Sequence, residues 1–213
     1  VSIPLFGDGD TGFGNLLNVK RTVEGYARAG FGCVMLEDQV LPKRCGHTRG
    51  KAVVPRAEAL LRIRAAVDAR NEGSDILIMA RTDARATDGL DEAIARCRAF
   101  AEIGADITFL EAPLSEAEMR RYCDETPGRK MVNLIESGKT PLLPLARLEA
   151  IGYKIAVYPL TLLSVSIKAM RAALERIRRE ETADVLDFAE LQAAVGFPDY
   201  YAGEDRYCAP REG

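Results

Sequence analysis

Short apolar runs alternate with longer stretches of helical period along most of this chain. Six runs rich in Ile, Val, Leu and Met show little polar alternation, which is typical of parallel strands that are covered on both faces. The predicted strands are residues 2–6, 33–36, 76–80, 107–110, 131–135 and 154–158. Each interval between them is long enough to hold a helix.

These intervals carry the start and stop signals of helices. Proline opens one of them at Pro55, and Ser115 with Glu118 forms the Ser-x-x-Glu pattern of a capping box at the start of another. A glycine follows three of the predicted helices, as is common at helix C-termini. The predicted helices are residues 18–29, 55–70, 89–103, 115–126, 144–151 and 162–181.

The regular alternation of strand and helix predicts a parallel α/β fold, and its unbroken rhythm favours a TIM-type (β/α)₈ barrel. Six of the eight units are visible, so the first two are expected upstream of Val1. Residues 1–183 would form units 3 to 8, and residues 184–213 a tail with a short helix at 188–192 and a docking turn at 196–201. The alternative is an open doubly wound sheet, which no glycine-rich dinucleotide loop supports.

The composition narrows the class of protein. The chain has 213 residues, of which 47% are hydrophobic, and a formal net charge of −3 without a basic face for nucleic acid. No apolar run approaches the ~20 residues of a membrane-spanning helix. The five cysteines show neither a disulfide framework nor zinc spacing. We therefore expect a soluble, cytoplasmic protein whose partners are small molecules and copies of itself.

Chemically capable side chains follow every predicted strand. Asp8 and Asp10 come after the first strand, Glu37 after the second, Arg81 after the third, Glu111 after the fourth, Asn133 and Glu136 around the end of the fifth, and Pro159 after the sixth. In a parallel barrel all these positions meet at the C-terminal face, where such enzymes keep their active sites. The pattern therefore predicts one joint site.

Within this site, three carboxylates are candidate ligands for a cation. Asp8 and Asp10 lie on the same side of an extended segment, because side chains alternate with period two, and Glu37 ends the neighbouring strand. Oxygen ligands and a single histidine in the chain favour Mg²⁺ or Mn²⁺ over zinc. Arg81 offers a bidentate fork for a substrate carboxylate, and it is also compatible with an ion pair to Glu111 or Asp83.

A cysteine among positive charges is the other chemical signal. Cys45 lies in a loop with Lys43, Arg44 and His47, and cationic neighbours lower the pKa of a thiol and make it reactive. His47, the only histidine, could orient that thiol. The cysteines at positions 33 and 97 are instead expected to be small buried hydrophobic residues on a strand and a helix.

Together these residues resemble the isocitrate lyase/phosphoenolpyruvate mutase superfamily, over nearly the whole chain. The resembling segments are residues 7–14, 37–39, 43–47, 80–83, 111–113 and 133–141. The resemblance implies a barrel with a terminal helix swapped between subunits, commonly in a dimer of dimers, and Mg²⁺-dependent chemistry on 2-oxo or 2-hydroxy dicarboxylates. It implies catalytic roles for Cys45, His47, Arg81 and Glu111, with Cys45 as the acid that protonates the carbanion. The implied substrate contacts are Asp10, Lys43, Gly46, Arg81, Asn133, Glu136, Ser137 and Pro159.

The cysteine favours the lyase branch of this superfamily. Residues 136–141 and 158–160 are similar to those of members that cleave 2,3-dimethylmalate or 2-methylisocitrate, which predicts a carbon–carbon lyase for a 2-hydroxy dicarboxylate. Three alternatives stay open: a carboxyphosphonoenolpyruvate phosphonomutase, which handles P–C bonds; an oxaloacetate hydrolase, disfavoured by Pro159; and a fragment that depends on a partner.

Overall fold

A computed structural model of the chain describes residues 2–44 and 50–207. The chain divides into two compact units, Val1–Thr161 and Leu162–Gly213, which are described separately. The first unit contains the sheet and the candidate site. The division into barrel units at 1–183 and a tail at 184–213 stays a prediction.

The first unit is built on a parallel six-stranded sheet whose spatial order follows the chain order. The strands are β1 (Phe6–Asp8), β2 (Cys33–Glu37), β3 (Leu77–Thr82), β4 (Ile107–Leu110), β5 (Arg129–Asn133) and β6 (Ile155–Val157). Sequential neighbours joined by helical crossovers are the arrangement of a barrel, because a doubly wound sheet reverses its strand order at a switch point. The predicted parallel α/β architecture is confirmed, and the open doubly wound alternative is wrong.

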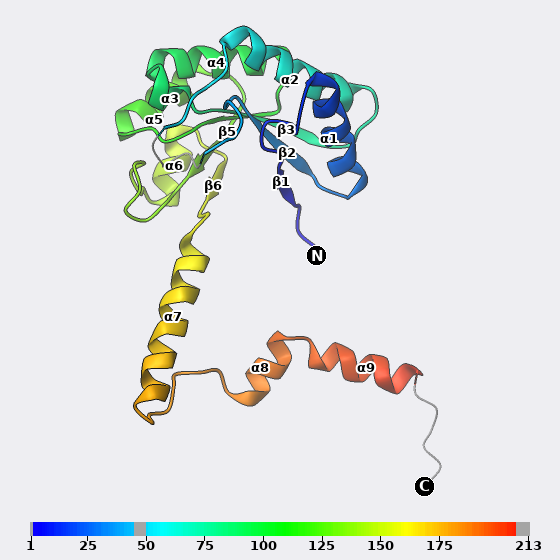
Figure 1. Ribbon diagram of the computed structural model, residues 1–213, viewed down its shortest axis with the longest axis vertical. Helices are drawn as coiled ribbons and strands as arrows, with labels where there is room; N and C mark the ends of the chain where they lie inside the picture. The colour runs from blue at the N-terminus through cyan, green and yellow to red at the C-terminus, as the bar shows by residue number, and fades with distance from the viewer. Residues whose placement is uncertain (1, 45–49, 208–213) are drawn as a thin grey trace. The chain divides into compact units, whose positions relative to one another are not determined.

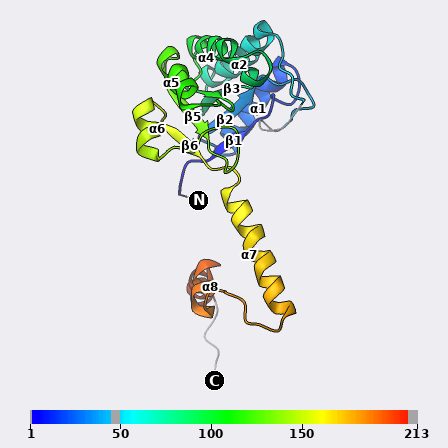
Figure 2. The same cartoon turned by 90° about the vertical axis from the view of Figure 1, so that its left-hand side faces the viewer.

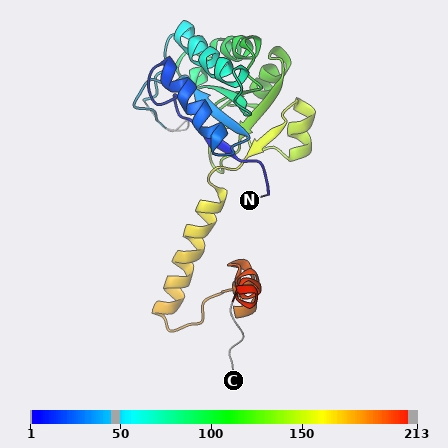
Figure 3. The same cartoon turned by 90° about the vertical axis from the view of Figure 1, so that its right-hand side faces the viewer.

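Helices cover one face of this sheet (Figures 1, 2 and 3). They are α1 (Leu16–Arg28), α2 (Arg56–Asn71), α3 (Ala84–Thr87), α4 (Leu90–Ile103), α5 (Glu116–Glu125) and α6 (Leu145–Ile151). Between sheet and helices lie two apolar clusters, one centred on Val34, Leu36 and Ile63 and the other on Leu110 and Tyr122. We call the helix-covered face the outer face and the opposite one the inner face.

The helix ends follow the sequence signals closely. Asn15 caps α1, with its side chain accepting from the backbone N–H of Asn18 and that of Asn18 accepting in return. The Ser115 side chain accepts from the N–H of Glu118 at the start of α5. In a capping box the Glu118 side chain would also accept from the N–H of Ser115, but here it accepts from the N–H of Leu114.

Two predicted strands are out of position. The predicted run at 2–6 ends where β1 begins. The residues that pair with Cys33–Met35 of β2 are Phe6, Gly7 and Asp8. Asp8 therefore lies on a strand and does not follow one. The run at 131–135 is displaced by two residues, because β5 starts at the charged Arg129 and Lys130, of which Lys130 is buried.

The second unit is helical. Its helices are α7 (Thr161–Arg178, which begins at the last residue of the first unit), α8 (Phe188–Ala194) and α9 (Phe197–Tyr207). The docking turn predicted at 196–201 is wrong, because Phe197 starts a helix with Pro198 in its first turn, where proline is tolerated. Within the described part of the chain, none of the helices combines the length and apolar character that a membrane crossing requires.

Candidate active site

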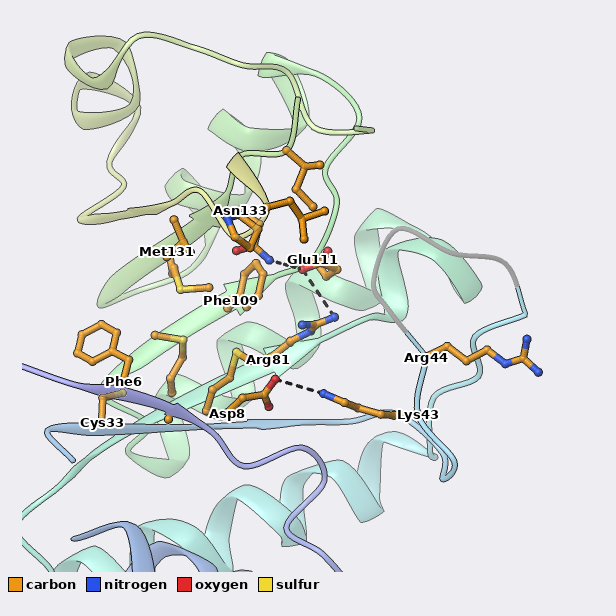
Figure 4. Close-up of a pocket in the computed structure, with 17 residues that line it drawn as sticks. Phe6, Asp8, Cys33, Lys43, Arg44, Arg81, Phe109, Glu111, Met131 and Asn133 are labelled. Carbon is orange, nitrogen blue, oxygen red and sulfur yellow. Dashed lines mark hydrogen bonds and ion pairs between the residues drawn. The ribbon is translucent and has the colours of Figure 1, made fainter. Parts of the chain in front are cut away.

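The inner face of the sheet carries an apolar layer and, one step further along each strand, a polar layer. Cys33, Met79, Ile107, Phe109 and Met131 pack together on this face. Because side chains alternate, the residues two positions beyond also point inward. They are Asp8 after Phe6, Glu37 after Met35, Arg81 after Met79, Glu111 after Phe109 and Asn133 after Met131. A cavity of about 350 Å³ opens over both layers (Figure 4).

Glu37 is the most perturbed carboxylate of this polar layer. Its side chain is fully buried, and neither carboxylate oxygen accepts a hydrogen bond within the described residues. Burial raises the pKa of Glu37 to about 7, although the nearby Arg81 guanidinium works against this shift. A buried carboxylate without donors is costly unless a cation joins it.

Lys43 lies among the three carboxylates that the sequence marked as cation ligands. Its Nζ atom is 3.2 Å from Asp8 Oδ2 and 3.8 Å from Glu37 Oε1, and it also pairs closely with Asp10. Partial burial opposes the charge on this lysine, but the contacts with Asp10, Glu37 and Asp8 raise its pKa. The ammonium group therefore marks a position at which the three carboxylates attract a cation.

Arg81 is held inside a ring of carboxylates. Its Nε donates to Asp83 Oδ2 at 2.9 Å and its Nη2 to Asp83 Oδ1 at 3.2 Å. Glu37 Oε2 is 3.3 Å from Nε, as follows from the direct register of Glu37 with Arg81, and Glu111 Oε2 is 3.7 Å from Nη2. Both ion pairs expected from the sequence, with Glu111 and with Asp83, are present. Burial opposes the charge, but these acids hold the pKa of Arg81 above its usual value.

Glu111 connects the arginine to the amide of the next strand. The Asn133 Nδ2 donates to Glu111 Oε2 at 3.3 Å, and Figure 4 shows Arg81, Glu111 and Asn133 facing one another across the cavity. Arg81 also lies 5.3 Å above the ring of Phe109, which fixes the plane of the guanidinium. Strands β3, β4 and β5 thus present a cation, an anion and an amide on one face.

Carboxylates are numerous in this polar layer, which suits a divalent cation. Ion pairs among the described residues connect five carboxylates with three cations. Their members are Asp8, Asp10, Glu37, Asp83 and Glu111 with Lys43, Lys51 and Arg81. No group of three or more His, Cys, Asp or Glu side chains in residues 2–44 and 50–207 is arranged to hold an ion by itself. Mg²⁺ does not need one, because it keeps waters and takes one or two carboxylates plus substrate oxygens.

Some of the predicted site residues line the cavity, and others do not. Asp8, Lys43, Arg81, Glu111, Asn133 and Pro159 line the cavity. Glu136 lies outside that lining and accepts a hydrogen bond from Thr161 at 2.6 Å, and Ser137 has a positive φ of 60° in the same loop. Cys45, Gly46 and His47 lie outside the described residues, so their roles stay predictions. Cys33 and Cys97 are buried, as expected, and burial raises the pKa of Cys33 to about 12.

A second charged layer, which the sequence analysis missed, supports the strand ends from the outer face. Asp38 accepts from Thr82 Oγ1 at 2.6 Å, from the Asp83 N–H at 2.9 Å and from Arg96 at 3.1 Å. Arg62 donates to the backbone carbonyl of Glu37 at 2.6 Å. A usable signal existed, because Arg62 and Arg96 occupy apolar-stripe positions of α2 and α4, beside Ile63 and Cys97.

Two further contacts position single elements of the site. The Tyr26 hydroxyl of α1 donates to the carbonyl of Asp8 at 2.7 Å, and its ring lies against Gly7, where a Cβ atom would be 2.3 Å from Cε1. Two hydrogen bonds join Gln39 to Arg44: Gln39 Nε2 donates to the Arg44 carbonyl at 2.8 Å, and the Arg44 backbone N–H donates to Gln39 Oε1 at 2.9 Å. The stem that leads to residues 45–49 is thus fixed by a buried amide.

Comparison with known proteins assigns the chain to a family. The phosphoenolpyruvate phosphomutase family model matches residues 1–178, and the chain belongs to the phosphoenolpyruvate mutase/isocitrate lyase superfamily. It is 44% identical over 98% of its length to the 2,3-dimethylmalate lyase of Eubacterium barkeri, and 40% identical over 94% to a 2-methylisocitrate lyase of Aeropyrum pernix. It spans 74% and 66% of these two relatives. The predicted class, a carbon–carbon lyase, is confirmed by these relatives.

Solved structures agree with this assignment. A crystal structure of 2,3-dimethylmalate lyase matches with a TM-score of 0.90 at 36% identity, covering 100% of this chain and 72% of that one. The TIM-type fold predicted from the sequence is thereby confirmed, whereas helix swapping stays a prediction. A phosphonopyruvate hydrolase in complex with oxalate and Mg²⁺ matches with a TM-score of 0.81 at 31% identity, covering 97% of this chain and 74% of that one.

Proposed function

We propose that this chain is a Mg²⁺-dependent lyase that cleaves a 2-hydroxy dicarboxylate of the 2,3-dimethylmalate or 2-methylisocitrate type into a 2-oxo acid and a carboxylate. The observation that carries the proposal is the position of Arg81, which lines the cavity, beside a cluster of carboxylates. An anion and a divalent cation can bind there side by side. The names of the relatives support the substrate class.

Asp8, Asp10 and Glu37 would hold the cation, some of them through water. Bound there, Mg²⁺ supplies a Lewis acid for the oxygen atoms of the substrate. The Lys43 ammonium, which shares these three carboxylates in the structure, would then be released toward a substrate carboxylate. This exchange gives Lys43 the substrate contact expected from the sequence.

Side chains of this protein would bind the substrate carboxylate and stabilise the negative charge that develops during cleavage. Arg81 and Asn133 would hold the substrate carboxylate and the negative charge that develops on cleavage, and Glu111 orients both. A base removes the hydroxyl proton, a C=O bond forms, and the C–C electron pair passes to the departing carbon. Cys45 is proposed to donate the proton that neutralises this carbanion.

The apolar wall of the cavity favours alkyl-substituted substrates. Ile135, Val157, Pro159 and Leu160 are among the residues that line the cavity. Burying a methyl group against such a wall is favourable by about 0.8 kcal/mol per CH₂-sized group. We therefore expect dimethylmalate or methylisocitrate to be preferred over oxaloacetate. Gly46, Glu136 and Ser137 complete the proposed substrate contacts.

The test is a steady-state assay of 2,3-dimethylmalate, 2-methylisocitrate and oxaloacetate with Mg²⁺, using wild-type protein, Cys45→Ser and the control Cys123→Ser. Cys123 lies in the outer apolar cluster away from the cavity. We expect Cys45→Ser to lower kcat by about 100-fold or more while Mg²⁺ binding is unchanged, since general acids contribute about 10²–10⁴-fold. Equal rates in Cys45→Ser and wild type would exclude Cys45 as the proton donor, and no turnover of any dicarboxylate by wild type would exclude the lyase.

A phosphonate reaction is the second candidate. It is favoured by the matching family model, which describes a phosphomutase, and the same cation cluster and Arg81 could hold a phosphonate. Phosphorus NMR of reaction mixtures separates the two, because only the second candidate makes or breaks a P–C bond. A P–C product with no cleavage of dicarboxylates would favour the phosphonate reaction over the lyase.

We propose in addition that the chain forms a homo-oligomer, a dimer of dimers with helix swapping. Helix α7 carries an exposed stripe of apolar side chains with the spacing of one helix face. The stripe consists of Leu163, Ile167, Met170, Leu174 and Ile177. Light scattering should give a multiple of the 23.3 kDa chain mass for wild type and a smaller particle for Met170→Glu. A wild-type monomer would contradict this proposal, and localisation in the cytoplasm stays a prediction.

A further inference from the structure

Asp83, at the end of β3, shares its carboxylate between two buried cations. Arg81 donates to both of its oxygens, and the Nζ of Lys51 lies 2.9 Å from Oδ1. The side chain of Asp83 is fully buried and that of Lys51 is 3% exposed. Burial works against ionisation of Asp83, but Arg81 and Lys51 together lower its pKa.

A second buried cation on this carboxylate requires a reason. One arginine already satisfies both oxygens of Asp83, and burying a lysine is costly. Arg81, however, also faces Glu37 and Glu111, so three acids surround a single guanidinium. Lys43 lies near Glu37, and Lys51 pairs with Asp83. Without Lys51, the buried Asp83 would draw on Arg81 alone, and less of the positive charge of the guanidinium would be directed toward the cavity.

We propose that Lys51 is a positioning residue for Arg81, acting through Asp83: it compensates the Asp83 carboxylate, so that Arg81 stays fixed and retains positive charge toward the cavity for an anionic ligand. The proposal rests on the proposed function insofar as Arg81 is taken as the site of a substrate carboxylate. Lys51 itself need not touch the substrate, since it is absent from the residues that line the cavity.

Lys51 also connects Asp83 to the part of the chain that follows residues 45–49. Lys51 comes just after residues 45–49, and Gln39 holds Arg44 just before them. Val40 and Ala52 are joined by a backbone hydrogen bond of 2.9 Å, which brings the two stems together. The ion pair of Lys51 with Asp83 therefore ties one stem of the Cys45 segment to the residue that orients Arg81.

The test is calorimetric titration of oxalate in the presence of Mg²⁺ into wild type, Lys51→Met, Asp83→Asn and the double variant. Lys51 and Asp83 are in contact, so their effects on binding are coupled, and we expect Lys51→Met to weaken oxalate binding by about tenfold or more. In the Asp83→Asn background the same change should cost less than about threefold, because the charge that Lys51 compensates is gone. An equal loss in both backgrounds would overturn the proposal, since Lys51 would then act directly on the anion.

A matched control and a second readout separate positioning from folding. Lys130→Met removes another buried lysine, one that faces Cys123, and should leave oxalate affinity unchanged. The Nε–H resonance of Arg81, assigned by its loss in Arg81→Lys, should shift in Lys51→Met and stay in place in Lys130→Met. An unshifted Arg81 resonance in folded Lys51→Met also overturns the proposal, even if Asp83→Asn abolishes binding.

Failure of the Lys51 proposal can be distinguished from failure of the proposed lyase function. A wild-type protein that binds oxalate but cleaves no dicarboxylate refutes the lyase and leaves the Lys51 result to be judged on binding. A wild-type protein that does not bind oxalate shows that Arg81 is not an anion site and overturns the role of Lys51 as well.

Discussion

Glu37 and Asp38 are neighbours in the chain, equally buried, and opposite in their surroundings. Glu37 points to the inner face, where no described residue donates a hydrogen bond to its oxygens. Asp38 points to the outer face, where Thr82, the Asp83 N–H and Arg96 all donate to it. Burial raises the pKa of both carboxylates, but Glu37 pairs with Lys43 and Arg81, which line the cavity, whereas the described partners of Asp38 do not line it.

The difference separates a carboxylate kept for a ligand from one used by the fold. A buried acid whose hydrogen bonds are satisfied stabilises the elements that it joins, and losing it leaves a buried cation unpaired. A buried acid without donors lowers stability until a cation binds. On this basis the outer layer around Asp38 is structural, and the inner layer around Glu37 is the functional site.

The largest expected effect is on stability. Asp38→Asn should lower the free energy of unfolding by about 3 kcal/mol, because the buried Arg96 loses its buried acid partner and keeps only the partly exposed Glu92. The isosteric change Glu37→Gln should cost less than about 1 kcal/mol, because no hydrogen bond to Glu37 is lost and Arg81 and Lys43 keep other acid partners. Urea unfolding of metal-free proteins measures both. Similar losses for the two variants would remove the distinction between the layers.

The reverse order is expected for metal binding. Glu37→Gln should weaken Mn²⁺ binding by about 100-fold, since an anionic oxygen is lost from the cation cluster. Glu72→Gln, an exposed acid paired with Lys20, is the matched control and should bind as wild type does. Isothermal titration gives the affinities, and an unchanged value for Glu37→Gln would place the cation elsewhere.

A smaller effect is expected in the pH dependence of metal binding. Glu37 is protonated below its pKa of about 7, so a cation must displace a proton there. Mn²⁺ affinity should fall by about tenfold per unit as the pH is lowered from 7 to 5, and level off above 7. Without metal, the raised pKa makes the folded state hold this proton more tightly than the unfolded chain, so stability falls as the pH rises from 4.5 to 7.

Glu37→Gln should lack both of these dependences. Titrations of wild type and Glu37→Gln at several pH values give the comparison. A slope that persists unchanged in the variant would assign the titrating group to another residue.

The smallest effect on stability is expected for Glu92, a partly exposed acid that contacts Arg96 of the outer layer. Glu92 pairs with the exposed Arg56 and with Arg96, and these contacts lower its pKa to about 2. Its contribution to stability is present above pH 4.5 and lost as the pH falls toward 2. Because the site is partly exposed, Glu92→Gln should cost at most about 1 kcal/mol at pH 7. A loss as large as that of Asp38→Asn would mean that Glu92 belongs to the buried network.

The sequence predicts the architecture and the inner polar layer of the site, because both follow from the pattern of apolar and polar residues along the chain. Apolar runs locate the strands, and the period of two then places Glu37, Arg81 and Glu111 on one face. Its errors have physical causes: Gly7 and Asp8 pair in β1 although their composition is that of a turn, and Pro198 fits the first turn of α9 although it suggests a break.

The supporting layer is harder to predict, because its pairs join distant elements. Arg96 and Asp38 are 58 residues apart, and Lys51 and Asp83 are 32 apart. Spacing along one helix or strand cannot reveal such pairs. A charged residue inside an apolar stripe, as at Arg62 and Arg96, is the local trace that they leave.

The most direct test of the central claim is anomalous diffraction from crystals of the protein with Mn²⁺ and oxalate. Our account predicts a manganese peak beside Asp8, Asp10 and Glu37, reached directly or through water, with Lys43 displaced and oxalate against Arg81. A cavity without manganese, in which Lys43 still bridges the three carboxylates, would contradict it.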